Sequence, residues 1–209
     1  MHPTSSQAHW NNVYATKPTD RVSWYQPHAE ASLALIASAG LPPEAAIIDI
    51  GGGASTLVDD LLQAGYRNVS VLDIAAVALQ KNRDRLGDAA ARVHWIEGDI
   101  TRMAFPDNAF DLWHDRAVFH FLTEAVDRQA YVRAASHAIK PGGHLIVATF
   151  AEDGPQQCSG LPVARYSAAA LHAEFSQAFR LLETRYETHQ TPFATAQRFV
   201  YCHWRKISP

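Results

Sequence analysis

The sequence feature that most constrains the fold is a short apolar run ending in three glycines, AIIDIGGG at residues 46–53. Apolar side chains at helical spacing follow within residues 57–62. A buried parallel strand, a glycine turn and a helix together form the first unit of a nucleotide-binding α/β sheet. The glycines let the backbone turn tightly and let a ligand lie against bare peptide, where a Cβ would collide.

The residues around the glycines distinguish two classes of nucleotide cofactor. A dinucleotide-binding turn reads G-x-G-x-x-G, and Gly51 and Gly53 fit it, but position 56 is Thr. Asp49 lies just before the turn, where its carboxylate suits a cationic ligand and repels a diphosphate. The turn therefore favours an amino-acid-bearing sulfonium nucleoside over NAD.

A second carboxylate stands at the end of the next expected strand, residues 69–74. Asp73 follows Gly53 by twenty residues, a separation at which a carboxylate reaches the ribose hydroxyls of a nucleoside held at the first turn. A carboxylate accepts two hydrogen bonds from a cis-diol, whereas an amide offers one acceptor oxygen. The alternative is an ordinary turn aspartate, but together with the glycine motif a ribose contact is expected.

These motifs resemble the class I S-adenosylmethionine (SAM) methyltransferases, whose first motif reads [D/E]-x-G-x-G-x-[G/S]. Four residues occupy its positions in order: Asp49, Gly51, Gly53 and Ser55. The resemblance implies a methyl-transferring enzyme with SAM as cofactor. It also implies a single α/β, Rossmann-like domain with a seven-stranded, mostly parallel sheet and an antiparallel last strand. Residues 1–30 are expected to form an N-terminal aromatic arm or lid, and residues 31–209 the SAM-binding domain.

The resemblance further implies which residues hold the cofactor. Ile74 is expected to pack on the adenine, Asp99 to accept a hydrogen bond from the adenine amino group, and Ile100 to contribute a backbone contact. The full expected set is Tyr14, Arg21, Trp24, Asp49, Gly51, Gly52, Gly53, Asp73, Ile74, Asp99, Ile100 and Asp115.

The arm carries its own resemblance. The pattern W-x-x-x-Y at residues 10–14, followed by S-W-Y at 23–25, is similar to the entry segment of small bacterial methyltransferases and of some lysine methyltransferases. This similarity implies that Tyr14 and Arg21 approach the cofactor carboxylate and that Trp24 lines the substrate mouth. The alternative is that the aromatic rings only pack on the domain.

The residues expected to face the transferred methyl group lie after the fourth strand. Residues 105–116 contain a Pro-Asp-Asn turn and then the F-D pair that begins the family's fourth motif. Ligands of open α/β sheets bind outside the carboxyl ends of the strands. The candidates for chemistry are therefore His114, Asp115, Arg116 and His120. Two structural alternatives stay open: a packed core histidine at 120, and a salt bridge between residues 115 and 116 that orders the loop.

The remaining elements follow from periodicity and turn residues. Helices are expected over 30–39, 75–86, 124–139 and 167–178, and strands over 93–100, 144–150, 179–186 and 197–204. Residues 152–162 are expected to form a loop on the ligand side of the sheet. Within it, Cys158 is interpreted as a small buried thiol, in preference to a reactive group or a substrate contact.

Composition limits the environment and the partners. A length of 209 residues with 47% hydrophobic and 19% charged residues indicates one soluble globular domain. The formal net charge of −3 gives no basic surface for nucleic acid. Two cysteines cannot form a disulfide framework, and neither a signal pattern nor a membrane-spanning stretch is seen. A cytoplasmic monomer or weak homodimer, without nucleic acid or membrane as partner, is expected.

Three functions remain open. The first is methyl transfer to a small-molecule acceptor (a thiol, metalloid or amine), because the compact chain has no added substrate domain. The second is a protein-lysine methyltransferase, which the entry segment favours and the sequence WHDR at residues 113–116 disfavours. The third is a non-catalytic nucleoside-binding protein. No metal site is expected, because the histidines and cysteines near the site lack short paired ligand spacings.

Overall fold

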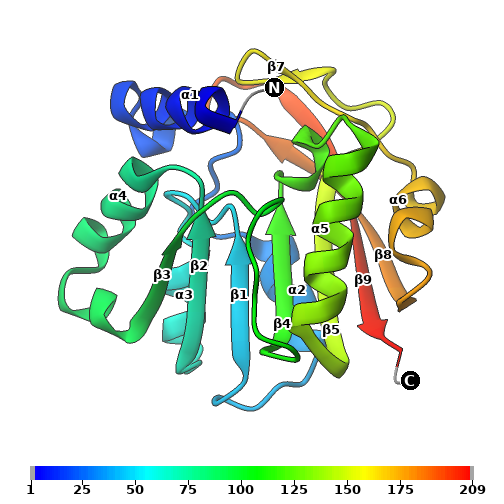
Figure 1. Ribbon diagram of the computed structural model, residues 1–209. Coiled ribbons are helices and arrows are strands. Elements are labelled where there is room, and N and C mark those ends of the chain that lie inside the picture. The colour runs from blue at the N-terminus through cyan, green and yellow to red at the C-terminus, as the bar shows by residue number, and fades with distance from the viewer. Residues whose placement is uncertain (1–2, 208–209) are drawn as a thin grey trace.

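The computed structural model of the protein describes residues 3–207 (Figure 1). Residues 1–2 and 208–209, at the ends of the expected arm and domain, lie outside the described residues. The helices are α1 (Pro3–Thr16), α2 (Glu30–Ser38), α3 (Leu57–Gln63), α4 (Ala76–Leu86), α5 (Ala125–Ala138) and α6 (Ala168–Phe175), with short 3₁₀ turns η1 (Thr19–Arg21), η2 (Gly87–Arg92) and η3 (Phe119–Phe121). The strands are β1 (Ala46–Ile50), β2 (Asn68–Asp73), β3 (Val93–Glu97), β4 (Phe110–Arg116), β5 (Ile139–Phe150), β6 (Gln157–Cys158), β7 (Leu161–Pro162), β8 (Phe179–Gln190) and β9 (Ala196–Lys206).

The central sheet has the order β3-β2-β1-β4-β5-β9-β8. Pairs from β3 to β5 are parallel, whereas β9 runs antiparallel to both β5 and β8. This confirms the predicted seven-stranded, mostly parallel sheet with an antiparallel last strand. Strand β1 is buried along its whole length, because helices cover both faces of a parallel sheet.

Helices on the two faces build two hydrophobic layers (Figure 1). Apolar residues of α2, α3 and α4 pack in one cluster with Ile47, and those of α5 and α6 pack in the other with Ile48. Successive strand residues point to opposite faces, so each buried strand supplies both layers. The carboxyl ends of the parallel strands are left uncovered by these helices and meet at one edge of the sheet.

The arm closes over that edge. Helix α1 lies across the strand ends next to α4 (Figure 1), and the Asn11 side chain accepts a hydrogen bond from the first-turn amide of Val77 in α4 (3.2 Å). The aromatic arm expected here from the sequence is a helix in the structure. Trp10, Val13 and Tyr14 have the i, i+3, i+4 spacing of a helix face, and the last two are buried.

Two segments differ from the sequence-based expectation. Residues 140–143, Lys-Pro-Gly-Gly, fall between the helix expected over 124–139 and the strand expected over 144–150, but they lie inside β5, which begins at Ile139. A Cβ at Gly143 would lie 3.0 Å from the carbonyl oxygen of Asp111, so glycine lets β5 run close to β4 there. The loop after β5 contains the small β6–β7 hairpin. Within the described residues, no helix combines the length and apolarity that a bilayer crossing requires.

Candidate active site

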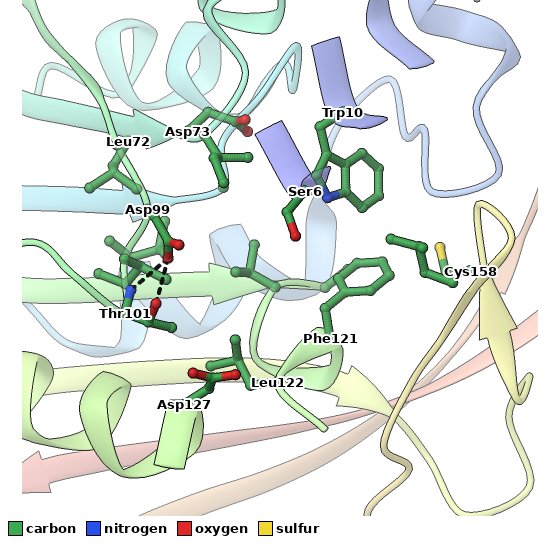
Figure 2. Close-up of a pocket in the computed structure, with 18 of the residues that line it drawn as sticks. Ser6, Trp10, Leu72, Asp73, Asp99, Thr101, Phe121, Leu122, Asp127 and Cys158 are labelled. Carbon is green, nitrogen blue, oxygen red and sulfur yellow. Dashed lines mark hydrogen bonds between the residues drawn. The ribbon is translucent and has the colours of Figure 1, made fainter. Parts of the chain in front are cut away.

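A cavity of about 450 Å³ lies at the carboxyl ends of the strands (Figure 2). Its walls come from α1, from the ends of β1, β2, β3 and β4, from the start of α5 and from the β6–β7 hairpin. We call the part formed by Asp73, Ile74, Asp99 and Ile100 the cofactor side. The part formed by Trp10, Phe121, Leu122, Asp127 and Cys158 is the acceptor side. A second cavity of about 50 Å³ shares four lining residues with the first: Tyr14, Trp24, Gly51 and Arg116.

The glycine turn is tied to β2 and has no room for side chains. The amides of Gly51 and Gly52 both donate to the carbonyl oxygen of Leu72. Gly51 has φ of +64°, and a Cβ there would collide with the side chain of Val118. A Cβ on Gly53 would lie 2.5 Å from the Tyr14 hydroxyl oxygen. The turn therefore presents bare backbone: Gly51 lines both cavities, while Gly52 lines only the small one.

Asp73 occupies the end of β2 on the cofactor side. Its side chain is 5% exposed, and one carboxyl oxygen accepts a hydrogen bond from the amide of Ala75 (2.8 Å). Burial raises the pKa of this carboxyl to about 7, although the backbone amides around it oppose the shift. A ligand that donates hydrogen bonds here stabilises the ionised form.

Asp99 faces the same cavity from the segment after β3. One carboxyl oxygen accepts hydrogen bonds from the Thr101 amide (2.9 Å) and hydroxyl (2.7 Å), as Figure 2 shows. These bonds fix the carboxylate in a tight turn while Ile100 and Ile74 add apolar wall on either side. The carboxyl ends of neighbouring parallel strands thus bring two acidic residues to one cavity.

Aromatic rings of the arm form the wall opposite the strands. Trp10 makes edge-to-face contacts with Trp24 (ring centroids 5.8 Å apart) and Phe121 (5.1 Å), and Tyr14 makes one with Trp24 (6.2 Å). All four rings line the main cavity. Burial, and after it the nearby Asp73 carboxylate, raise the pKa of the Tyr14 phenol well above its usual value, so the phenol stays neutral.

Of the two predicted arginines, the structure brings one to the cavities. Arg116 lines both, and its guanidinium donates to Tyr201 Oη (2.9 Å) and to the Trp24 carbonyl (3.1 Å) while lying over the Phe199 ring. Arg21 ends the 3₁₀ turn η1, is exposed and lines neither cavity. A helical arm followed by this turn directs residue 21 outward, away from the strand ends.

Asp115 and His120, both predicted as catalytic, lie in the interior and line neither cavity. Asp115 accepts hydrogen bonds from the amides of Val118 and Phe119 and from Tyr131 Oη (2.7 Å), which fixes the turn after β4. Burial raises the pKa of Asp115 to about 7. His120 is 0% exposed, and burial lowers its pKa to about 3, so its ring is neutral.

Asp49 and His114 meet at the small cavity. They are register partners on β1 and β4, and His114 Nδ1 lies 2.7 Å from Asp49 Oδ1. Both side chains are buried. Both line the small cavity and neither lines the main one. The two predicted residues are thus brought together, but not on the acceptor side.

Cys158 lines the acceptor side from the β6–β7 hairpin (Figure 2). Its side chain is buried, and burial raises its pKa to about 11. A thiol with that pKa is protonated near neutral pH and is a poor nucleophile.

Of the predicted site residues, eight line the main cavity: Tyr14, Trp24, Gly51, Asp73, Ile74, Asp99, Ile100 and Arg116. The sequence analysis did not select the acceptor-side residues Trp10, Phe121, Leu122 and Asp127. Trp10 belonged to the arm pattern, and its helical spacing to Tyr14 is the signal that places both rings on one face. Leu122 and Asp127 come after the fourth strand and belong to no motif of the sequence.

The residues present fit a nucleoside cofactor. The turn is bare backbone, because a Cβ at Gly51 or Gly53 would collide with a neighbouring side chain, and the buried Asp73 carboxyl lines the main cavity together with Gly51. Asp99 offers a second acceptor next to the apolar side chains of residues 74 and 100. The fold is a Rossmann-like domain, and these residues offer a nucleoside two carboxylates and an apolar wall.

Comparison with known proteins finds methyltransferases over about half of the chain. The family model described as "Methyltransferase domain" matches residues 47–143. The ubiquinone/menaquinone biosynthesis C-methyltransferase UbiE of Shewanella woodyi is 28% identical over 121 residues, 56% of this chain and 47% of that protein. The eEF1A lysine and N-terminal methyltransferase of Mus musculus is 24% identical over 111 residues, 53% of this chain and 16% of that protein. The chain thus spans less than half the length of these relatives.

A solved structure extends the comparison to nearly the whole chain. It is the Burkholderia thailandensis 1,6-didemethyltoxoflavin-N1-methyltransferase with bound 1,6-didemethyltoxoflavin and S-adenosylhomocysteine. Its TM-score is 0.70 at 19% identity, over 98% of this chain and 85% of that one. These similarities support a class I SAM-dependent methyltransferase with SAM as its cofactor.

Proposed function

We propose that the protein transfers the methyl group of SAM to a small-molecule acceptor: a thiol, a metalloid or an amine. The observation that carries this proposal is the acceptor side, which α1 and the β6–β7 hairpin bound. The cavity continues from the two carboxylates of the cofactor side to a space bounded by Trp10, Phe121 and the β6–β7 hairpin. A cavity of about 450 Å³ lies within the usual range for small-molecule sites, roughly 300–1,000 Å³.

When bound, SAM supplies a methyl group on a cationic sulfur and therefore brings its own leaving group. The chain's contribution is then to position the acceptor and exclude water, and alignment of two reactants can supply about 7–11 kcal/mol of the barrier. The aromatic wall of α1 excludes water from the acceptor side. Asp127, at the start of α5, offers a carboxylate there for the proton that a thiol or ammonium acceptor loses.

Two other acceptors are kept as alternatives. The UbiE relatives are named as quinone C-methyltransferases, and the rings of Trp10 and Phe121 would suit a flat ring. The eEF1A relatives are named as lysine methyltransferases. Helix α1 and the hairpin cover the acceptor side, which favours a free small molecule over a lysine on a folded protein. A non-catalytic nucleoside-binding role is the further alternative.

Labelling of a cell lysate with methyl-labelled SAM tests the proposal. The protein is added to lysate before and after removal of small molecules, with Asp73→Ala as the inactive control. We expect label in the small-molecule fraction only, and loss of labelling after depletion. Label confined to protein would reject the small-molecule acceptor. A screen of thiols, amines, metalloids and quinols for S-adenosylhomocysteine release then identifies the acceptor, and no release with any of them would favour the non-catalytic role.

We also propose that the protein acts in the cytoplasm as a monomer or weak homodimer and without nucleic acid, in line with its net charge of −3. Sedimentation over a range of protein concentrations measures the oligomeric state. The same experiment with added RNA measures nucleic-acid binding.

A further inference from the structure

Three buried polar side chains form a hydrogen-bonded chain behind the glycine turn. Ser32 Oγ of α2 lies 2.9 Å from His114 Nε2, and His114 Nδ1 lies 2.7 Å from Asp49 Oδ1. All three residues are at most 3% exposed. They come from α2, β4 and β1, three elements that meet only in the folded protein.

The chain of hydrogen bonds leaves one carboxylate oxygen free. Among residues 3–207 no donor within hydrogen-bonding distance reaches Asp49 Oδ2. A Cβ on Gly52 would lie 2.6 Å from that oxygen, so Oδ2 faces the glycine turn, and Asp49 lines the small cavity there. Asp49 thus presents an acceptor atom to a space that holds only a few atoms.

The short hydrogen bond between His114 Nδ1 and Asp49 Oδ1 holds one carboxyl oxygen in place. Ser32 Oγ lies within hydrogen-bonding distance of the other ring nitrogen, which fixes the plane of the imidazole. A carboxylate with one fixed and one free oxygen is suited to an ammonium group.

We infer that His114, oriented by Ser32, is a positioning residue that holds the Asp49 side chain in place for the ammonium of the cofactor's amino-acid tail. The inference rests on the proposed function and concerns the tail alone. The small cavity shares Tyr14, Trp24, Gly51 and Arg116 with the main cavity, so the two cavities adjoin. His114 was a candidate for chemistry by sequence, but its ring nitrogens are both engaged in this buried chain.

Two ligands separate this role from general structural support. S-adenosylhomocysteine carries the amino-acid tail, whereas 5′-methylthioadenosine has the same nucleoside without it. Calorimetry measures the Kd of both for the wild type, His114→Leu, His114→Asn and Ser32→Ala. Asparagine is the conservative variant, because its amide N–H can replace Nδ1–H toward residue 49.

We expect His114→Leu to weaken S-adenosylhomocysteine about 30-fold, the effect of losing a charged hydrogen bond, and 5′-methylthioadenosine less than about twofold. His114→Asn should restore most of the loss, and Ser32→Ala should weaken S-adenosylhomocysteine about threefold. Equal weakening of both ligands, or no weakening of either, would overturn the inference. If His114→Leu does not fold, the ratio of the two Kd values in Ser32→Ala decides it: an unchanged ratio counts against the inference. A wild type that binds neither ligand contradicts the proposed function itself.

Discussion

The two sides of the main cavity are built in different ways. On the cofactor side, Asp73 and Asp99 follow directly from strands β2 and β3, and backbone amides at residues 75 and 101 hold their carboxyl groups. On the acceptor side, α1, the turn after β4 and the β6–β7 hairpin meet from distant parts of the chain. The sheet therefore fixes the first side, while the second depends on the packing of connecting segments. Substitutions on the first side should affect cofactor binding, and those on the second the acceptor alone.

The largest expected effect is on the cofactor side. Asp73→Ala removes the carboxylate that we propose accepts two ribose hydrogen bonds, so S-adenosylhomocysteine affinity should fall about 100-fold. The matched control is Asp88→Ala, because Asp88 is an exposed aspartate in η2. This variant should keep the affinity of the wild type. Calorimetry measures both, and a thermal melt checks folding. Unchanged affinity in Asp73→Ala would remove this residue from the cofactor site.

The glycine turn offers a test with a closely matched control. Gly51 and Gly40 have almost the same φ, +64° and +63°, but a Cβ on Gly51 meets Val118 whereas one on Gly40 meets nothing within 4 Å. Gly40→Ala should cost about 1 kcal/mol of unfolding free energy and leave affinity unchanged. Gly51→Ala should cost about 3 kcal/mol and weaken S-adenosylhomocysteine about 30-fold. Equal effects of the two substitutions would show that backbone strain, rather than the collision with Val118, is responsible.

A pH dependence should mark the cofactor side. The Asp73 pKa of about 7 leaves its carboxyl mostly protonated below neutral pH, and only the ionised form offers both oxygens as strong acceptors to the proposed ribose hydroxyls. S-adenosylhomocysteine affinity should therefore rise about tenfold between about pH 6 and about pH 8. The raised pKa has the opposite effect on the free protein, which loses stability as pH rises from about 4 to about 7. In Asp73→Asn the affinity should be independent of pH, and a slope that persists would assign it to another group.

On the acceptor side the effect should be smaller and confined to the acceptor. Phe121→Ala removes part of the aromatic wall and should raise the acceptor KM about fivefold, since a portion of the acceptor's apolar contact is lost. Its S-adenosylhomocysteine Kd should stay within about twofold. Phe193→Ala, at an exposed phenylalanine, is the control. A parallel loss of cofactor affinity would show that the two sides are not independent.

The smallest expected effect on turnover is at His120, which lies outside both cavities. His120→Asn should change kcat per folded molecule less than about twofold. Its pKa of about 3 in the folded state means that it contributes stability above about pH 6.5, which is lost as pH falls toward 3. Acid unfolding of the variant should be correspondingly less steep. A large loss of kcat with normal folding would instead support the catalytic role predicted from the sequence.

The cofactor side could be predicted from the sequence because its residues lie at fixed short distances from strands. Asp73 ends an apolar run, and the glycine turn interrupts the strand–helix pattern, so local periodicity located both. The acceptor side could not be predicted in the same way. Phe121 and Trp10 are in contact because α1 crosses the strand ends. No sequence pattern in either segment predicts that contact. Burial of His120 and the outward position of Arg21 likewise depend on how turns pack, which sequence spacing does not determine.

The long β8–β9 hairpin has a consequence for biosynthesis. It carries the hydroxyl of Tyr201, the carboxylate of Glu187 and the ring of Phe199 to the guanidinium of Arg116. A nascent chain that has left the ribosome only as far as residue 150 already contains every strand end of the cofactor side. Its arginine still lacks these partners, so the wall shared by the two cavities becomes rigid only when translation has passed residue 201 and the hairpin has paired.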